Sequence, residues 1–106
     1  MERKKSFVFY FDALPAIEAL EPEQRGHLFT AIVEFAIRAS EGAVTLEEGL
    51  AAHPELNNEA RIAFFFIAGH IVRDTASWNA AQKRRSEAAR ARRSADKKEW
   101  MDEFVR

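Results

Sequence analysis

Three histidines are the residues of this chain best suited by type to metal binding or proton transfer. His70 and Asp74 lie four residues apart and therefore share one face of a helix. A zinc site needs at least three protein ligands, and this pair leaves the others unsupplied. We therefore expect no metal site, and we interpret His70 as a polar edge of a core helix paired with Asp74. We expect His53, which precedes Pro54, to be a solvent-exposed loop residue.

The remaining chemistry-bearing residues form no catalytic pattern. Carboxylates fall at the ends of expected helices, where the helix dipole already accounts for them: Glu18, Glu21, Glu23, Glu47 and Glu48. The chain has no Cys, which excludes thiolate nucleophiles and Cys-rich zinc sites, and its sequence has no phosphate-binding glycine loop, HExxH or GxSxG motif. We expect a protein that is not an enzyme and that carries no cofactor.

A basic segment near the C-terminal end is the strongest sign of a partner. Residues 83–98 hold eight basic residues against two acids, a net charge of +6, whereas residues 6–82 hold four arginines against eleven acids, a net charge of −7. Such asymmetry is typical of chains whose basic end contacts nucleic acid or an acidic protein surface. The predicted nucleic-acid contacts are Lys83, Arg84, Arg85, Arg90, Arg92, Arg93, Lys97 and Lys98.

The spacing of these charges leaves three interpretations open. At 100° per residue they encircle a helix rather than line one side of it. This fits a solvated arm, a helix set in a groove with phosphates on both sides, or docking on an acidic protein surface. A basic-leucine-zipper interpretation of residues 79–85 fails because the alanine pair directly follows Asn79 and no leucine heptad comes after.

Large apolar side chains interrupt this polar tail and form a second candidate surface. They are Trp78, Trp100, Met101 and Phe104. Two interpretations stay open: these residues pack on the body or on a second copy of the chain, or they fill the groove of another protein. A host protein and a homodimer are therefore expected partners besides nucleic acid.

Helices are the elements that must position these groups. The aromatic run Ser6–Phe11 has no second strand to pair with, so we interpret it as an apolar lead-in to a helix. Asp12 is the expected N-cap of a first helix ending at Leu20. A second helix is expected over 22–39, and Gly42 is expected to end it in the left-handed conformation.

The second half of the chain predicts one short and one long helix. Glu34 and Arg38 are expected to form a surface ion pair, and Thr45 is expected to cap a short helix over 46–52. Asn57 or Asn58 then caps the central helix of the core.

Apolar residues recur on several sides of the central helix from Glu59 to Ser77, and they place Ile62 and Phe66 among the core residues. The sequence contains no helix breaker before Lys98. A helix over 58–98 would be about 60 Å long, more than a small domain can cover, so its basic part must project, fray or meet a partner.

Together these elements predict an all-α fold, a small helical domain with a long C-terminal helix. Residues 1–78 are the expected helical core and 79–106 a basic extension of the same domain. The longest apolar stretch, 62–72, is far short of the roughly 20 residues of a membrane span, so we expect no membrane contact. The absence of Cys and of a signal sequence favours the cytoplasm.

Several segments resemble a known family. They are Ser-Phe-Val-Phe-Tyr at 6–10, Ala-Ile-Val-Glu-Phe-Ala at 31–36, Ala-Phe-Phe-Phe-Ile at 63–67, Ile-Val-Arg-Asp at 71–74 and the aromatic at 78. Over residues 5–93 the chain resembles small uncharacterised domains of phages and prophages, some of them described as replication-associated or replisome-organiser-like. Members often continue into a Gly-Lys-Lys-Gly-Gly-Arg-Pro tail, whereas residues 91–98 here read Ala-Arg-Arg-Ser-Ala-Asp-Lys-Lys.

The resemblance implies a phage or prophage context in a bacterial host cytoplasm and brings no catalytic residues. Combined with the basic segment, it predicts a non-enzymatic accessory protein that contacts nucleic acid through residues 83–98. The alternative is a protein-interaction module that modulates, for instance inhibits, a host complex.

Overall fold

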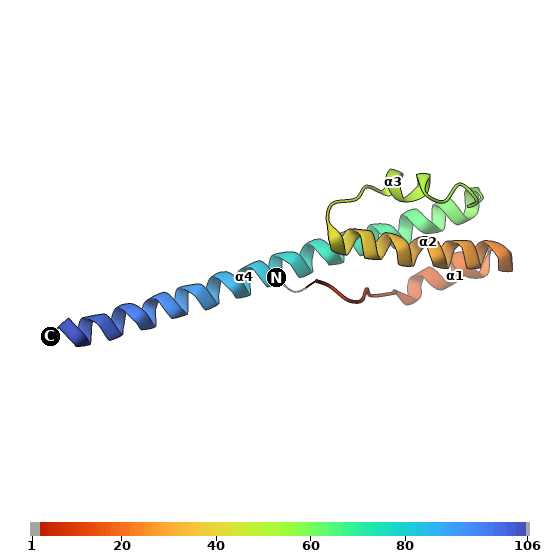
Figure 1. Ribbon diagram of the computed structural model, residues 1–106. Coiled ribbons are helices and arrows are strands. Elements are labelled where there is room, and N and C mark those ends of the chain that lie inside the picture. The colour runs from red at the N-terminus through yellow and green to blue at the C-terminus, as the bar shows by residue number, and fades with distance from the viewer. Residues whose placement is uncertain (1–2, 106) are drawn as a thin grey trace. The chain divides into compact units, whose positions relative to one another are not determined.

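The computed structural model describes the backbone of residues 3–105 and the side chains of residues 3–95. Over residues 3–105 it is helical with no strand, which confirms the all-α prediction. A 3-10 turn, η1 (Phe11–Ala13), precedes four helices: α1 (Leu14–Glu18), α2 (Pro22–Glu41), α3 (Leu46–Ala51) and α4 (Asn58–Val105) (Figure 1). The chain divides within α4 into two compact units, Met1–Ala76 and Ser77–Arg106, which are described separately.

Polar caps begin α3 and α4. The side chain of Thr45 accepts a hydrogen bond from the backbone N–H of Glu48 at 3.1 Å, as the sequence predicts. The Oδ1 atom of Asn57 accepts from the backbone N–H of Ala60 at 2.9 Å, so Asn57 rather than Asn58 caps α4. These bonds satisfy N–H groups that have no partner within the helix itself.

The first helix is shorter than predicted and starts differently. Asp12 lies inside η1, and no side chain caps either η1 or α1, so the prediction of Asp12 as N-cap is wrong. α1 ends at Glu18, and the side chain of Arg25 in α2 binds two backbone carbonyls at this end of the helix. Its Nε donates to the carbonyl of Leu20 and its Nη2 to that of Glu18, both at 2.9 Å.

The C-terminal end of α2 also departs from prediction. Gly42 has a φ of 167°, which is extended backbone and not the left-handed conformation. Arg38 lies 3.4 Å from Glu48 of α3 instead of pairing with Glu34. The predicted ion pair within α2 is therefore replaced by one between two helices.

The core of the first unit is built where α2, α3 and α4 meet. The ring of Phe35 in α2 meets the ring of Phe64 in α4 edge-on, with centroids 5.5 Å apart. Gly49 of α3 lies against both rings, so close that a Cβ atom there would be 2.7 Å from Phe35 and 2.8 Å from Phe64. The largest buried residues of this core are Leu20, Leu28, Ile32, Phe35, Leu50, Leu56, Phe64, Ile67 and Ile71.

Within the first unit, α4 is covered on one side only. Its buried residues are Ala60, Ala63, Phe64, Ile67, Ala68, Ile71 and Thr75. Ile62 and Phe66, predicted to belong to the core, are exposed instead. The helix is apolar on more sides than α2 and α3 can cover, so part of its apolar surface faces outward.

The N-terminal segment is an extended lead-in without strand pairing, as predicted. The hydroxyl of Tyr10 donates to Asp74, with oxygens 2.8 and 3.0 Å away, and its ring lies 4.5 Å from the ring of His70. The predicted pair of His70 with Asp74 is therefore wrong. Nδ1 of His70 lies 3.0 Å from Nη2 of Arg73 instead.

The second unit, Ser77–Arg106, continues the helical backbone to Val105, beyond the predicted end near Lys98. Among its described side chains only Trp78, Ala81, Gln82 and Ala89 are half-buried, and the others are exposed. No helix in the described residues is both long and apolar enough to cross a membrane.

Candidate nucleic-acid interface

The predicted nucleic-acid contacts lie on the helix of the second unit. The sequence between 77 and 95 is rich in Ala and Arg and contains no Gly or Pro, which favours an uninterrupted helix. Six basic side chains are described here, and all of them are exposed: Lys83, Arg84, Arg85, Arg90, Arg92 and Arg93. Glu87 is the one acid between them.

These six cations make few contacts with the rest of the described residues. No described carboxylate forms a salt bridge with any of them. Their one hydrogen bond to a described residue runs from Nε of Arg93 to the carbonyl of Ala89, at 3.5 Å. On the confirmed helix they point in all directions, as the sequence predicts. Like charges at this spacing repel one another, so an anionic partner would relieve an unfavourable interaction.

Of the other predicted contact residues, only Trp78 has a described side chain. The side chains of Lys97, Lys98, Trp100, Met101 and Phe104 lie outside the described residues. Trp78 is half-buried and belongs to the same unit as the basic residues.

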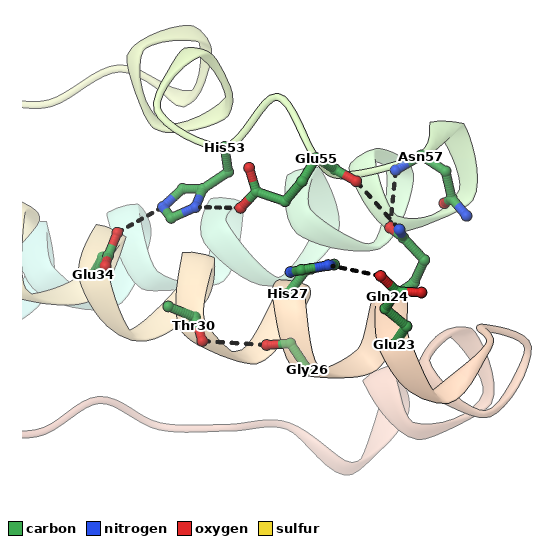
Figure 2. A network of polar contacts seen from close by, with 9 residues as sticks. All are labelled: Glu23, Gln24, Gly26, His27, Thr30, Glu34, His53, Glu55 and Asn57. Carbon is green, nitrogen blue, oxygen red and sulfur yellow. Dashed lines mark hydrogen bonds and ion pairs between the residues drawn. The ribbon is translucent and has the colours of Figure 1, made fainter.

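Sequence reasoning missed a polar network centred on His53. This residue is only 9% exposed, so the prediction of a solvent-exposed loop histidine is wrong. Its Nε2 lies 2.7 Å from an oxygen of Glu34 in α2, and its Nδ1 lies 3.0 Å from an oxygen of Glu55 (Figure 2). No periodic signal marks the pairing with Glu34, because the two residues are 19 positions apart and only the fold brings them together.

The geometry of His53 leaves it no free nitrogen for chemistry. Each ring nitrogen lies within hydrogen-bond distance of a carboxylate oxygen. With both ring nitrogens engaged, the side chain has none left to bind a metal or accept a proton from a substrate. Glu34 and Glu55 lie at opposite ring nitrogens, and the described residues contain no group of three His, Cys, Asp or Glu able to hold a metal ion.

A glutamine extends this network to the start of α4. Nε2 of Gln24 donates to the carbonyl of Glu55 at 3.2 Å, and its Oε1 accepts from the N–H of Asn57 at 2.9 Å (Figure 2). A hydrogen bond from its own backbone N–H, followed by the one from His53, lowers the pKa of Glu55 below its ordinary value. The network ties α2 to the connection between α3 and α4, which is a structural role.

The first unit also has an apolar pocket of about 160 Å³ between α1, α2 and α4 and the N-terminal segment. Phe9, Phe29 and Ile67 are among its lining residues, and Arg25 is the charged one. The guanidinium of Arg25 is already bonded to two backbone carbonyls. The other residues that line the pocket are apolar, so the pocket brings together no acid, base or nucleophile.

Comparison with known families places the chain in one of them. Residues 6–99 match a family described as a family of unknown function (DUF6291). Comparisons with curated proteins and with solved structures give no match. The resemblance to a family of uncharacterised domains is thereby confirmed. Since the match covers most of the chain, including the core of the first unit and all six exposed cations described above, the protein belongs to the DUF6291 family.

Proposed function

We propose that this protein is a non-enzymatic accessory protein of phage or prophage type that binds nucleic acid through the basic helix 83–98. The observation that carries the proposal is the cluster of six exposed cations on that helix, none of them in a salt bridge with a described carboxylate. A polyanion with regularly spaced phosphates is the partner whose charge matches this arrangement.

The composition of the cluster favours backbone contacts. Five of the six cations are arginines, whose planar guanidinium can hold a phosphate through two hydrogen bonds. Because they point to all sides of the helix, a helix set in a groove can meet phosphates of both flanking strands. We therefore expect binding that tolerates many sequences, since phosphate contacts position a protein without specifying bases.

Fluorescence anisotropy with labelled duplex and single-stranded oligonucleotides, over a series of salt concentrations, tests the proposal. Each phosphate contact adds about 0.9 to the slope of log K against log salt on duplex DNA. A triple variant, Arg84→Gln with Arg85→Gln and Arg90→Gln, is expected to lower this slope by about 3 and to weaken binding at every salt concentration.

The N-terminal basic cluster supplies a matched control. Arg3→Gln with Lys4→Gln and Lys5→Gln removes the same number of positive charges from the first unit, and we expect it to leave the slope close to that of the unchanged protein. No binding at low salt, or equal losses from the two triple variants, would overturn the proposal. A nuclease-treated lysate that still yields a stoichiometric protein partner, together with no oligonucleotide binding, would favour the protein-interaction alternative.

A further inference from the structure

The outward face of α4 within the first unit carries an apolar row that the other helices of this unit leave largely exposed. Ile62 is 70% exposed, Phe65 41%, Phe66 45% and Val72 40%, and Gly69 lies in their midst. Positions 62, 65, 69 and 72 follow the alternating three- and four-residue spacing of helices that pair along a seam. Large apolar residues at this spacing on an exposed face indicate a missing helix partner.

We propose that the partner is a second copy of this chain, with the two α4 helices antiparallel across a two-fold axis. In this arrangement Phe65 of one copy lies opposite Gly69 of the other, and Ile62 lies opposite Val72. The two-fold axis repeats each of these contacts, so the dimer contains both of them twice. Each bulky residue of the first half of the face thus meets a smaller residue of the second half, and the missing side chain of Gly69 leaves room for the ring of Phe65.

The charged residues beside this row, which we call the seam (62, 65, 69 and 72), are also complementary in an antiparallel pair. Glu59 and Arg73 lie on one side of it, seven residues before and after Phe66. Antiparallel pairing brings Glu59 of each copy close to Arg73 of the other, which gives two ion pairs per dimer. In a parallel pair in register these two residues would lie fourteen positions, about 21 Å, apart along the axis and would not meet.

Arg73 is able to make this contact. Its Nη1 lies 3.7 Å from the position that a Cβ of Gly69 would take, so in the single chain the guanidinium covers part of the seam. The side chain is exposed, and a swing toward Glu59 of the second copy would exchange its contact with His70 for an ion pair and uncover Gly69.

The size of the face predicts a weak, reversible dimer. A large apolar side chain has a total accessible surface of about 200 Å². At the exposed fractions given above, the four side chains together expose on the order of 400 Å² in one copy. Two copies with their polar rims then reach the lower end of the area that specific interfaces bury, about 1,200 Å². We expect a dissociation constant in the micromolar range.

Sedimentation equilibrium of the full chain, over micromolar to millimolar concentration, tests the pairing. The apparent mass should rise from 12.1 kDa toward twice that value. Gly69→Gln fills the space for Phe65 and should weaken the dimer about tenfold or more. Gly26→Gln is the matched control, because Gly26 is a helical glycine of α2 with nothing within 4 Å of an added Cβ, and it should leave the dimer unchanged.

A charge swap tests the orientation. Glu59→Lys and Arg73→Glu should each weaken the dimer, and the double variant should restore it because each new pair is again opposite in sign. A monomer at every concentration, a Gly69→Gln protein that dimerises as tightly as the control, or a double variant no tighter than the single ones would overturn the proposal. Circular dichroism of each variant shows whether its helices are intact.

Discussion

At the scale of single residues, His53 is the polar side chain expected to contribute to the stability of the first unit. It is nearly buried, and each ring nitrogen faces a carboxylate from a different segment. Truncation removes both hydrogen bonds to charged carboxylates, which themselves stay accessible to water. We therefore expect His53→Ala to lower the free energy of unfolding by about 1–3 kcal/mol in urea denaturation.

His27 provides the comparison for this prediction. Its ring lies 3.6 Å from Glu23 on the surface of α2, and such exposed pairs contribute little. His27→Ala should cost well under 1 kcal/mol. Equal losses from the two variants would mean that the bonds of His53 do not stabilise the fold.

Tyr10 offers a pH-dependent test of how the N-terminal segment docks on α4. The hydrogen bond to Asp74, with smaller contributions from desolvation and the charge of that carboxylate, raises the pKa of Tyr10 above its ordinary value of 10.0. The neutral phenol is the form that donates. A raised pKa in the folded protein means that the contact stabilises the fold below the unfolded pKa and is lost as the pH rises through the folded pKa.

Because Tyr10 is the one tyrosine of the chain, its phenolate absorbance can be followed directly. We expect a midpoint above 10.0 in the folded protein and a midpoint closer to that value in Asp74→Ala. Titration of the chain in denaturant supplies the unfolded reference. If the folded protein and Asp74→Ala titrate together, the segment is not held by this bond.

At the scale of elements, two glycines test how tightly α3 packs. An alanine usually stabilises a helix by about 1 kcal/mol relative to glycine. At Gly49 the added Cβ would lie 2.7–2.8 Å from the rings of Phe35 and Phe64, two buried side chains with no room to move. We expect Gly49→Ala to destabilise the fold by about 1–3 kcal/mol.

Gly26 of α2 has nothing within 4 Å of its added Cβ, so Gly26→Ala should show the helix preference alone and stabilise the fold by about 0.5–1 kcal/mol. Thermal unfolding of both variants measures the contrast. Stabilisation by Gly49→Ala would mean that α3 does not pack on these rings.

The elements also show what the sequence could and could not predict. The caps at Thr45 and Asn57 were predictable, because capping depends on residues three positions apart. The buried face of α4 was not, because apolar residues surround that helix and periodicity does not say which sides α2 and α3 cover. The same limit applies to His53, whose partner Glu34 comes close only after α2 and α3 have packed.

At the scale of the whole molecule, the two proposals rest on different parts of the chain. The basic residues lie in the second unit, and the pairing face lies in the first. Loss of one property need not remove the other, so a variant that fails to dimerise can still be tested for nucleic-acid binding. Dimerisation would place two basic segments in one particle.

This duplication predicts that long nucleic acids are bound more tightly than short ones. Once one basic segment is bound, a second segment in the same dimer is held at a high local concentration near the same molecule, which raises the overall affinity without any new contact. Gly69→Gln should therefore lose about tenfold or more in affinity for a long duplex and almost nothing for an oligonucleotide that accommodates one segment. Gly26→Gln should match the unchanged protein on both, as anisotropy titrations can measure. If Gly69→Gln loses the dimer in sedimentation but keeps its affinity for the long duplex, each copy binds independently and the dimer serves another purpose.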